Sequence, residues 1–217
     1  MKVAVVDPGS GNLASVLRAL RRAADEDGSG AAITVETQAE AVARADAIVM
    51  PGQGAFAACR RGLDLMPGMV EAVDEAVTRR GIPFLGICVG MQLMVERGLE
   101  HGTTPGLGWI AGEMAPMDPR GPGGEPLPLP QMGWNGLRFA PGSHPVLAGL
   151  EPGDHAYFVH SYALSGGRPE QILATADYGG PVVAAIGRDN MFGTQFHVEK
   201  SQFVGLRMLA NFLAWRP

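Results

Sequence analysis

Short apolar runs alternate with amphipathic segments through the first half of the chain. Residues 3–6 form a β-rich run. The apolar residues Leu13, Val16, Leu17 and Leu20 then repeat at the spacing of one helical face, with Arg18 among them and Arg21 and Arg22 directly after. The same alternation predicts strands at 33–37, 47–50 and 83–87 and helices at 40–45, 69–80 and 89–97. This βα alternation predicts a doubly wound α/β fold, in which a mostly parallel sheet carries helices on both faces.

The second half of the chain has a different pattern. Short β-like stretches predict an antiparallel β extension, at 109–115, 157–164, 172–176, 182–186 and 191–196, and a final helix follows at 202–215. Residues 118–130 hold five prolines and three glycines in thirteen positions. Such a segment is typical of an exposed loop or hairpin insertion.

Composition favours one domain. Apolar residues make up 46% of the chain and charged residues 18%, and no repeat is visible. This apolar content is enough to fill one sizeable core, so we predict a single domain over residues 1–217. Acidic residues outnumber basic ones by 22 to 17. The balance gives no counterion-release drive toward a phosphate backbone, so nucleic acid is not an expected partner.

The sequence indicates neither a leader nor a membrane span. The apolar run after Lys2 ends at Asp7, and nowhere do 18 apolar residues follow one another. Two cysteines, Cys59 and Cys88, do not make a disulfide framework in a chain of this size. We therefore expect a cytoplasmic protein in a reducing compartment, with either thiol free for chemistry.

The segment Gly86-Ile-Cys88-Val-Gly90 lies where the strand at 83–87 meets the next predicted helix. It has the form of a nucleophile elbow with cysteine in place of serine. The flanking glycines let strand and helix approach without Cβ clashes. A helix N-terminus favours the thiolate, and the N–H of Val89 is free to point at a developing oxyanion. Cys88 is the predicted nucleophile.

A cysteine nucleophile needs a base and a group that orients the base. Gln195-Phe-His197-Val-Glu199 supplies both at the end of an apolar β-like run. Residues i and i+2 of an extended backbone project to the same face, so Glu199 can reach one nitrogen of His197 while the other faces the thiol. Active sites of α/β sheets lie outside the carboxyl ends of strands, which is where this segment falls.

Other motifs are less specific. Pro51-Gly52-Gln53-Gly54 follows the strand at 47–50, and its loop either supplies a second oxyanion N–H or is an ordinary βα turn. Residues 9–14 fit a dinucleotide fingerprint, but Asp7-Pro8 intrudes before the first glycine and Glu36 lies 27 residues beyond it, so nicotinamide binding is not favoured.

Cysteine and histidine spacing points to no cofactor. Cys59 has no elbow and no nearby acid or base, which favours a packing role. No His or Cys pair has the close spacing of a zinc site. We expect neither a metal nor another cofactor.

Together these motifs resemble those of class I, or triad, glutamine amidotransferases. Residues 86–92 resemble the nucleophile motif of that family, and His197-Val198-Glu199 its His-Pro-Glu motif. Within the class, the chain is most similar to the glutaminase subunits of imidazole glycerol phosphate synthase, through residues 9–16, 51–54, 131–135, 157–162 and 197–201. Pro8 and Val198 depart from the family, which usually has Tyr and Pro there, but neither change removes a catalytic group.

The resemblance implies hydrolysis of glutamine to glutamate and ammonia. Cys88 would form a γ-glutamyl thioester, His197 would shuttle the proton, and Glu199 would hold and charge the imidazole. The same resemblance assigns the oxyanion to N–H groups of Val89 and the Gly52-Gln53 loop. It assigns the two ends of the substrate to Gln92, Ser161 and Tyr162.

The resemblance also implies a partner. The related glutaminases pass ammonia to a (β/α)₈ cyclase subunit in histidine biosynthesis, which combines it with a phosphorylated ribulosyl aminoimidazole carboxamide nucleotide. The residues expected to face this subunit in a heterodimer are Asn12, Trp134, Asn135, Lys200 and Ser201. Two alternatives stay open: another triad amidotransferase or γ-glutamyl hydrolase with a different acceptor, and a scaffold protein with a relict triad.

Overall fold

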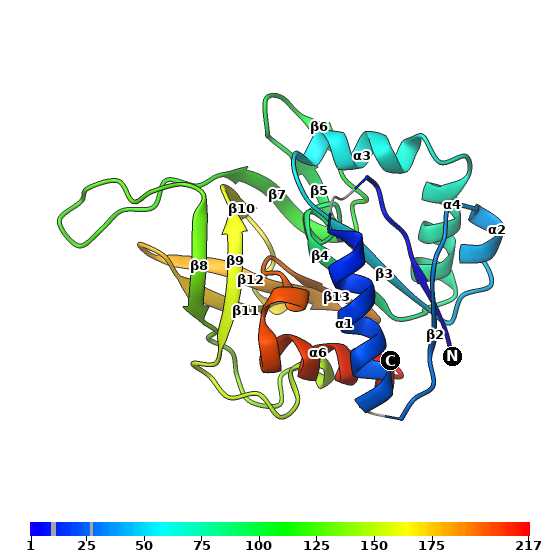
Figure 1. The fold of residues 1–217 in the computed structure, drawn as a ribbon. Helices are drawn as coiled ribbons and strands as arrows, with labels where there is room; N and C mark the ends of the chain where they lie inside the picture. The colour runs from blue at the N-terminus through cyan, green and yellow to red at the C-terminus, as the bar shows by residue number, and fades with distance from the viewer. Residues whose placement is uncertain (10–11, 27) are drawn as a thin grey trace.

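The central sheet is mostly parallel. The computed structural model describes residues 1–9, 12–26 and 28–217. Within these residues, seven strands lie in the order β11-β12-β13-β4-β3-β1-β2 (Figure 1). The parallel part comprises β1 (Lys2–Val5), β2 (Ala32–Val35), β3 (Ala47–Gly52), β4 (Phe84–Cys88) and β13 (Met191–Thr194). The antiparallel edge comprises β11 (Ile172–Asp177) and β12 (Pro181–Arg188).

Helices cover both faces of this sheet. α1 (Leu13–Glu26) and α6 (Gln202–Ala214) lie side by side against one face (Figure 1). The other face carries α2 (Ala39–Val42), α3 (Phe56–Asp64), α4 (Met69–Asp74) with its π-helical continuation η1 (Glu75–Arg79), and α5 (Val89–Gln92). The predicted doubly wound α/β fold is confirmed.

Two smaller sheets form part of the predicted β extension. The stretches expected there at 172–176, 182–186 and 191–196 lie instead in the central sheet as β11, β12 and β13, and β13 is parallel to β4. One has the order β10 (Tyr162–Ser165), β7 (Ile110–Pro116), β5 (Val95–Gly98) and β6 (Thr104–Pro105). The other pairs β8 (Gln131–Gly136) with β9 (His155–His160). Short turns of 3₁₀ helix lie at η2 (Pro145–Leu147), η3 (Pro169–Gln171) and η4 (Val198–Lys200). Between β7 and β8, residues 118–130 form a hairpin-like loop closed by a bridge between Arg120 and Pro126, the green loop that extends farthest from the sheet in Figure 1.

The predicted helix at 89–97 is wrong beyond its first turn. α5 ends at Gln92, and Val95–Gly98 is a strand that pairs with β7. The backbone carbonyls of the intervening residues accept hydrogen bonds from the segment before β7: Leu107 N–H donates to Leu93 O at 2.7 Å and Trp109 N–H to Met94 O at 2.9 Å. These tertiary bonds replace the bonds that a longer helix would have made.

Three further differences concern strands and one concerns a helix. The single strand expected at 157–164 divides at Ser161, because β9 pairs with β8 whereas β10 pairs with β7. The strands β6 and β8 and the helix α3 were not predicted.

Four central strands deliver the candidate residues to one edge. β1, β3, β4 and β13 are buried almost throughout, as expected for strands covered on both faces. They run parallel, so the residues that follow their carboxyl ends meet at the same edge of the sheet. Asn12, Gln53, Cys88 and His197 come from these four ends.

Candidate active site

Cys88 occupies a strained position at the end of β4. Its φ is 53° and its ψ is −112°, a conformation that residues other than glycine rarely adopt. Both flanking glycines are required by close packing. A Cβ at Gly86 would lie 2.7 Å from the Gly90 carbonyl oxygen, and one at Gly90 would lie 1.8 Å from that of Met50. The segment is therefore a sharp strand-to-helix turn.

The loop after β3 packs against the backbone that follows the nucleophile. A Cβ at Gly52 would lie 2.6 Å from the Gly90 nitrogen and 3.0 Å from the Val89 carbonyl carbon. Glycine at this position thus lets the Gly52-Gln53 loop lie beside Val89. The predicted oxyanion donors come from these two neighbouring segments.

His197 and Glu199 form a buried pair just beyond β13. The His197 Nδ1 lies 2.7 Å from the Glu199 Oε1, and the two side chains are 4% and 1% exposed. The expectation of an extended backbone through this segment is wrong, because Val198–Lys200 is a 3₁₀ turn. The turn brings the carboxylate to the ring, so the expected contact is made by different local geometry.

The charge state of His197 follows from its two partners. Burial lowers the pKa of the ring, but the hydrogen bonds with Cys88 and Glu199, together with the charges of these groups, outweigh burial and raise the pKa to about 9. The ring is therefore an imidazolium at neutral pH. A cationic ring between a sulfur and a carboxylate is the arrangement that activates a cysteine nucleophile.

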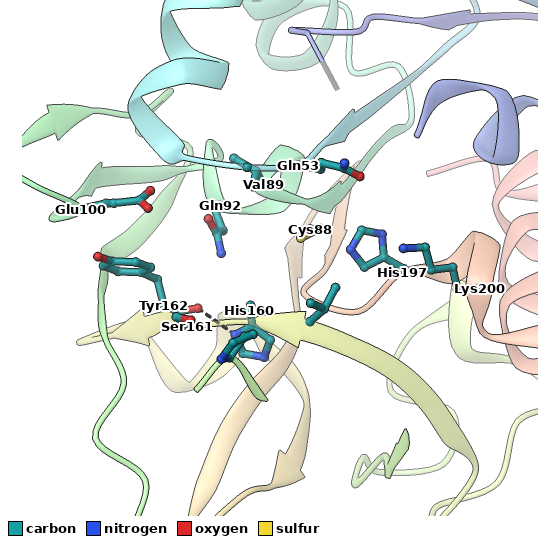
Figure 2. Close-up of a pocket in the computed structure, with 13 residues that line it drawn as sticks. Gln53, Cys88, Val89, Gln92, Glu100, His160, Ser161, Tyr162, His197 and Lys200 are labelled. Atoms are coloured by element: carbon teal, nitrogen blue, oxygen red, sulfur yellow. Dashed lines mark hydrogen bonds between the residues drawn. The ribbon is translucent and has the colours of Figure 1, made fainter. Parts of the chain in front are cut away.

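A cavity of about 430 Å³ opens beside the sulfur of Cys88 (Figure 2). The predicted residues that line it are Gln53, Cys88, Val89, Gln92, Ser161, Tyr162, His197 and Lys200. Gly52 lies one residue behind the wall, in contact with Val89 and Gly90. The structure therefore brings the predicted catalytic, oxyanion and substrate residues together around one cavity.

Two titratable lining residues, Glu100 and His160, were not predicted. Glu100 lies across the cavity from His197 in Figure 2, and its Oε2 accepts a hydrogen bond from the Phe56 N–H at 2.7 Å. His160 is buried, its Nδ1 lies 2.9 Å from the Tyr162 carbonyl oxygen, and burial lowers its pKa to about 4. The ring is thus neutral and holds the backbone that carries Ser161 and Tyr162. His160 lies inside the family-like segment 157–162, which was the one available signal; Glu100 has no motif.

The five residues expected at a partner surface divide into two groups. Trp134 is 44% exposed, its ring packs edge-on against Tyr157 at 5.8 Å, and the Nζ of Lys200 lies 5.6 Å above the same Tyr157 ring. Trp134, Tyr157 and Lys200 form one exposed cluster, which we call the Trp134 cluster.

The other three side chains have partners inside the chain. Asn12 donates to the Glu199 Oε1, so it supports the carboxylate of the pair. Asn135 donates to the Asp177 carbonyl oxygen at 3.1 Å. Ser201 is 1% exposed and its hydroxyl donates to the His197 carbonyl oxygen at 2.7 Å. The prediction that Ser201 faces a partner is wrong, because its side chain is buried beneath the catalytic turn.

Cys59 packs behind the cavity wall. It is 2% exposed, and its Sγ donates to the Gln53 carbonyl oxygen at 3.3 Å. Burial raises the pKa of this thiol to about 11, so it is protonated at neutral pH. The packing role expected from the sequence agrees with this placement, and the thiol also anchors the loop that carries Gln53.

The described residues offer neither a metal centre nor a membrane-spanning helix. In residues 1–9, 12–26 and 28–217, no group of three or more His, Cys, Asp or Glu side chains is placed to hold a metal ion. None of the helices in these ranges is long and apolar enough to cross a membrane. Of the dinucleotide-like segment 9–14, Ser10 and Gly11 lie outside the described residues, and Asn12 is turned toward Glu199.

Comparison with known proteins identifies the family of the chain. Residues 4–215 match the family model described as glutamine amidotransferase class-I. The chain is 56% identical over 220 residues to "Imidazole glycerol phosphate synthase subunit HisH" of Brucella suis biovar 1, and 54% identical over 217 residues to the protein of that name from Rhodospirillum rubrum; each alignment covers 100% of both chains. A glutamine amidotransferase crystal structure superimposes with a TM-score of 0.70 at 16% identity, covering 98% of this chain and 99% of the other, which supports the fold. The chain therefore belongs to the class I glutamine amidotransferase family, among relatives named imidazole glycerol phosphate synthase subunit HisH.

Proposed function

We propose that the chain is the glutaminase subunit of imidazole glycerol phosphate synthase, and that it works in the cytoplasm. The observation that carries the proposal is the arrangement of Cys88 and His197 on one wall of the cavity, with the carboxylate of Glu199 held 2.7 Å from the Nδ1 of His197. Amide cleavage needs a nucleophile and an acid. The sulfur of Cys88 supplies the nucleophile, and the imidazolium of His197 beside it supplies the acid.

The reaction proceeds through a thioester. The Cys88 thiolate attacks the carboxamide carbon of glutamine, and the oxyanion is held by N–H groups of Val89 and the Gly52-Gln53 loop. The imidazolium of His197 gives its proton to the departing amide nitrogen, and ammonia leaves. His197, now neutral, takes a proton from water as the water attacks the γ-glutamyl thioester. Glutamate is released and the thiolate–imidazolium pair is restored.

Substrate recognition follows from the polar groups on the cavity wall. Gln92 reaches the carboxamide end from the turn after the nucleophile. On the opposite wall, Glu100 offers a carboxylate of the sign that an α-ammonium group requires, and the Ser161-Tyr162 segment offers polar groups for the α-carboxylate. A glutamine bound across this cavity places its amide at Cys88.

The partner is a cyclase subunit that consumes the ammonia. Support comes from the relatives that share 54–56% identity over the whole chain, whose name states that they are subunits of the synthase. The Trp134 cluster presents an exposed aromatic ring and a lysine on the rim of the cavity, because Lys200 both lines the cavity and contacts Tyr157. A large exposed aromatic residue of this kind is a typical interface anchor.

One assay tests this function. Glutamate release from glutamine is measured for the chain alone, for the chain with the cyclase subunit, and for both with the nucleotide substrate of the cyclase. We expect low activity alone and a sharp increase with both additions. High activity alone that ignores the partner would support a free-standing amidohydrolase, and no activity in any arm would support a scaffold with a relict triad.

The Trp134 cluster provides a matched pair of variants for that assay. Trp134→Ala is expected to weaken assembly with the cyclase subunit and to lose the increase in glutamate release. Leu65→Ala should keep both, because Leu65 is 75% exposed and lies at the end of α3, outside the cavity wall. Equal assembly by the two variants would exclude this cluster from the interface.

The pH dependence of turnover should report on His197. The kcat for glutamine is expected to fall as pH rises through about 9, because His197 then loses the proton that it gives to ammonia. Glu199 raises this pKa, so Glu199→Gln should move the falling limb to lower pH. The measurement is kcat against pH for the wild type, Glu199→Gln and the surface control Glu113→Gln, whose carboxylate pairs with Arg97. A limb unmoved by Glu199→Gln would mean that another group controls it.

A further inference from the structure

Gln195 is a buried amide that lies against the sulfur of the nucleophile. Its side chain is fully buried, and its Nε2 lies 3.8 Å from the Cys88 Sγ as a hydrogen-bond donor. Its Oε1 accepts a hydrogen bond from the Gln92 Nε2 at 3.0 Å. Gln195 therefore connects a residue of the cavity wall to the reacting atom, and the mechanism above gives it no part.

The register of two parallel strands explains this position. On β13 and β4, Gly193 pairs with Gly86 and Thr194 with Ile87. Gln195 follows Thr194 directly after β13, and Cys88 follows Ile87 as the last residue of β4, so the two leave the carboxyl edge of the sheet side by side. The backbone N–H of Gln195 still bonds to the sheet, through the Ala184 carbonyl oxygen at 2.9 Å, which fixes the base of the side chain.

The orientation of the amide determines what it can do. Since the Oε1 is occupied by the Gln92 N–H, the amide nitrogen faces the sulfur. An amide N–H has no accessible protonation change, so it is a permanent donor. A hydrogen bond to an ionised acceptor is about twice as strong as one to a neutral acceptor, so this contact favours the thiolate over the thiol. It draws the Cys88 proton toward the Nε2 of His197, whose Nδ1 is held by Glu199.

We propose that Gln195 is a catalytic residue of this site, one that donates to Cys88 and stabilises its thiolate, and that Gln92 holds it in the donating orientation. The proposal deepens the glutaminase function proposed above and rests on it. The other titratable groups near the sulfur in the described part of the chain are on the cavity wall, directly behind it, or bonded to its Gln53 loop: His197, His160, Tyr162, Glu100 and Lys200 on the wall, Glu199 behind His197, and Cys59 bonded to Gln53. A substitution at Gln195 leaves all of these in place.

The test is the rate of Cys88 alkylation by iodoacetamide against pH, read by mass spectrometry of the intact free protein without glutamine. The midpoint is the pH at which Cys88 is alkylated at half of its maximal rate. In Gln195→Leu this midpoint should rise by about one pH unit, which means about ten times less thiolate at any pH below it. Gln195→Glu, which has the same shape and places a carboxylate at the sulfur, should raise it at least as far. The kcat for glutamine should fall by roughly tenfold or more in both, with a smaller change in KM.

Gln131→Leu is the matched control. Gln131 is also fully buried and also bonds another side-chain amide, Asn135 at 3.0 Å, but it lies on β8 and has no contact with Cys88 among the interactions described for it. Its alkylation midpoint should equal that of the wild type. Circular dichroism and thermal unfolding establish that each variant is folded, and Gln195→Glu serves if Gln195→Leu does not fold.

Two results would overturn the proposal. One is an unshifted Cys88 midpoint in both Gln195 variants, and the other is a raised KM with unchanged kcat, which would confine Gln195 to substrate binding. Because alkylation is measured without glutamine or partner, the shift is still read if the wild type proves to have no glutaminase activity. Failure of the proposed function and failure of this inference are therefore distinguishable.

Discussion

Cys88→Ser is expected to lower the kcat for glutamine by at least about 10⁴-fold, because removal of the nucleophile alone costs nearly as much as removal of a whole triad. Serine has the same shape and can take the same position in the turn, where the backbone is already held at a φ of 53°. The serine hydroxyl stays protonated beside His197, so the corresponding γ-glutamyl ester cannot form at a rate comparable to that of the thioester. The measurement is glutamate release in the presence of partner and nucleotide, with circular dichroism as the check on folding.

Cys59→Ser is the matched control for that loss. The second cysteine is equally buried, and serine keeps a donor for the Gln53 carbonyl oxygen. This variant should retain most of the activity. Turnover retained by Cys88→Ser, or lost equally in both variants, would place the chemistry elsewhere.

The sequence was sufficient for the catalytic turn because its chemistry is local. Glycines two positions before and after Cys88, at a junction between an apolar run and a new segment, describe a turn that other residues cannot make. The same holds for the contact between His197 and Glu199, which are two residues apart. Both features survived errors in the neighbouring secondary structure, since the helix after Cys88 is one turn long and the backbone after His197 is a 3₁₀ turn.

The missed elements depended on distant partners. Residues 93–95 are apolar and read equally well as helix or strand, and hydrogen bonds from residues 107–109 decide the matter. β8 exists because β9 pairs with it, and the nearest residues of the two strands, Gly136 and His155, are 19 positions apart in the sequence. In contrast, α3 carried a local signal, because Phe56, Cys59 and Leu63 are buried on one face at helical spacing.

The same reason separates the predicted from the unpredicted site residues. Gln195 reaches Cys88 only through the register of β13 on β4, and Glu100 reaches the cavity from the end of β5. Asn12 and Ser201 were expected at a partner surface because they have no role in cleaving an amide. Their side chains instead hold Glu199 and the His197 backbone, contacts that only the tertiary structure reveals.

Gly90→Ala is expected to destabilise the protein by at least about 3 kcal/mol, in the upper range for overpacking. The added Cβ would lie 1.8 Å from the Met50 carbonyl oxygen and 2.8 Å from its carbon, and backbone atoms of a central strand cannot move aside as a side chain can. Alanine gains about 1 kcal/mol in helix propensity over glycine, too little to offset this clash. Thermal unfolding should show a loss of roughly 6–12 °C in Tm for a chain of this size.

Gly123→Ala separates this clash from a general cost of removing glycine. The nearest atom to a Cβ at Gly123 is the Glu125 Oε2 at 2.8 Å, the far end of a flexible side chain in the exposed loop. Gly123→Ala should change the free energy of unfolding by no more than about 0.5 kcal/mol. An equal loss of stability in both variants would contradict the close contact of β3 with α5.

That contact also holds the Gly52-Gln53 loop beside Val89. A folded Gly90→Ala protein should therefore lose oxyanion stabilisation as well, with a fall in kcat and little change in KM.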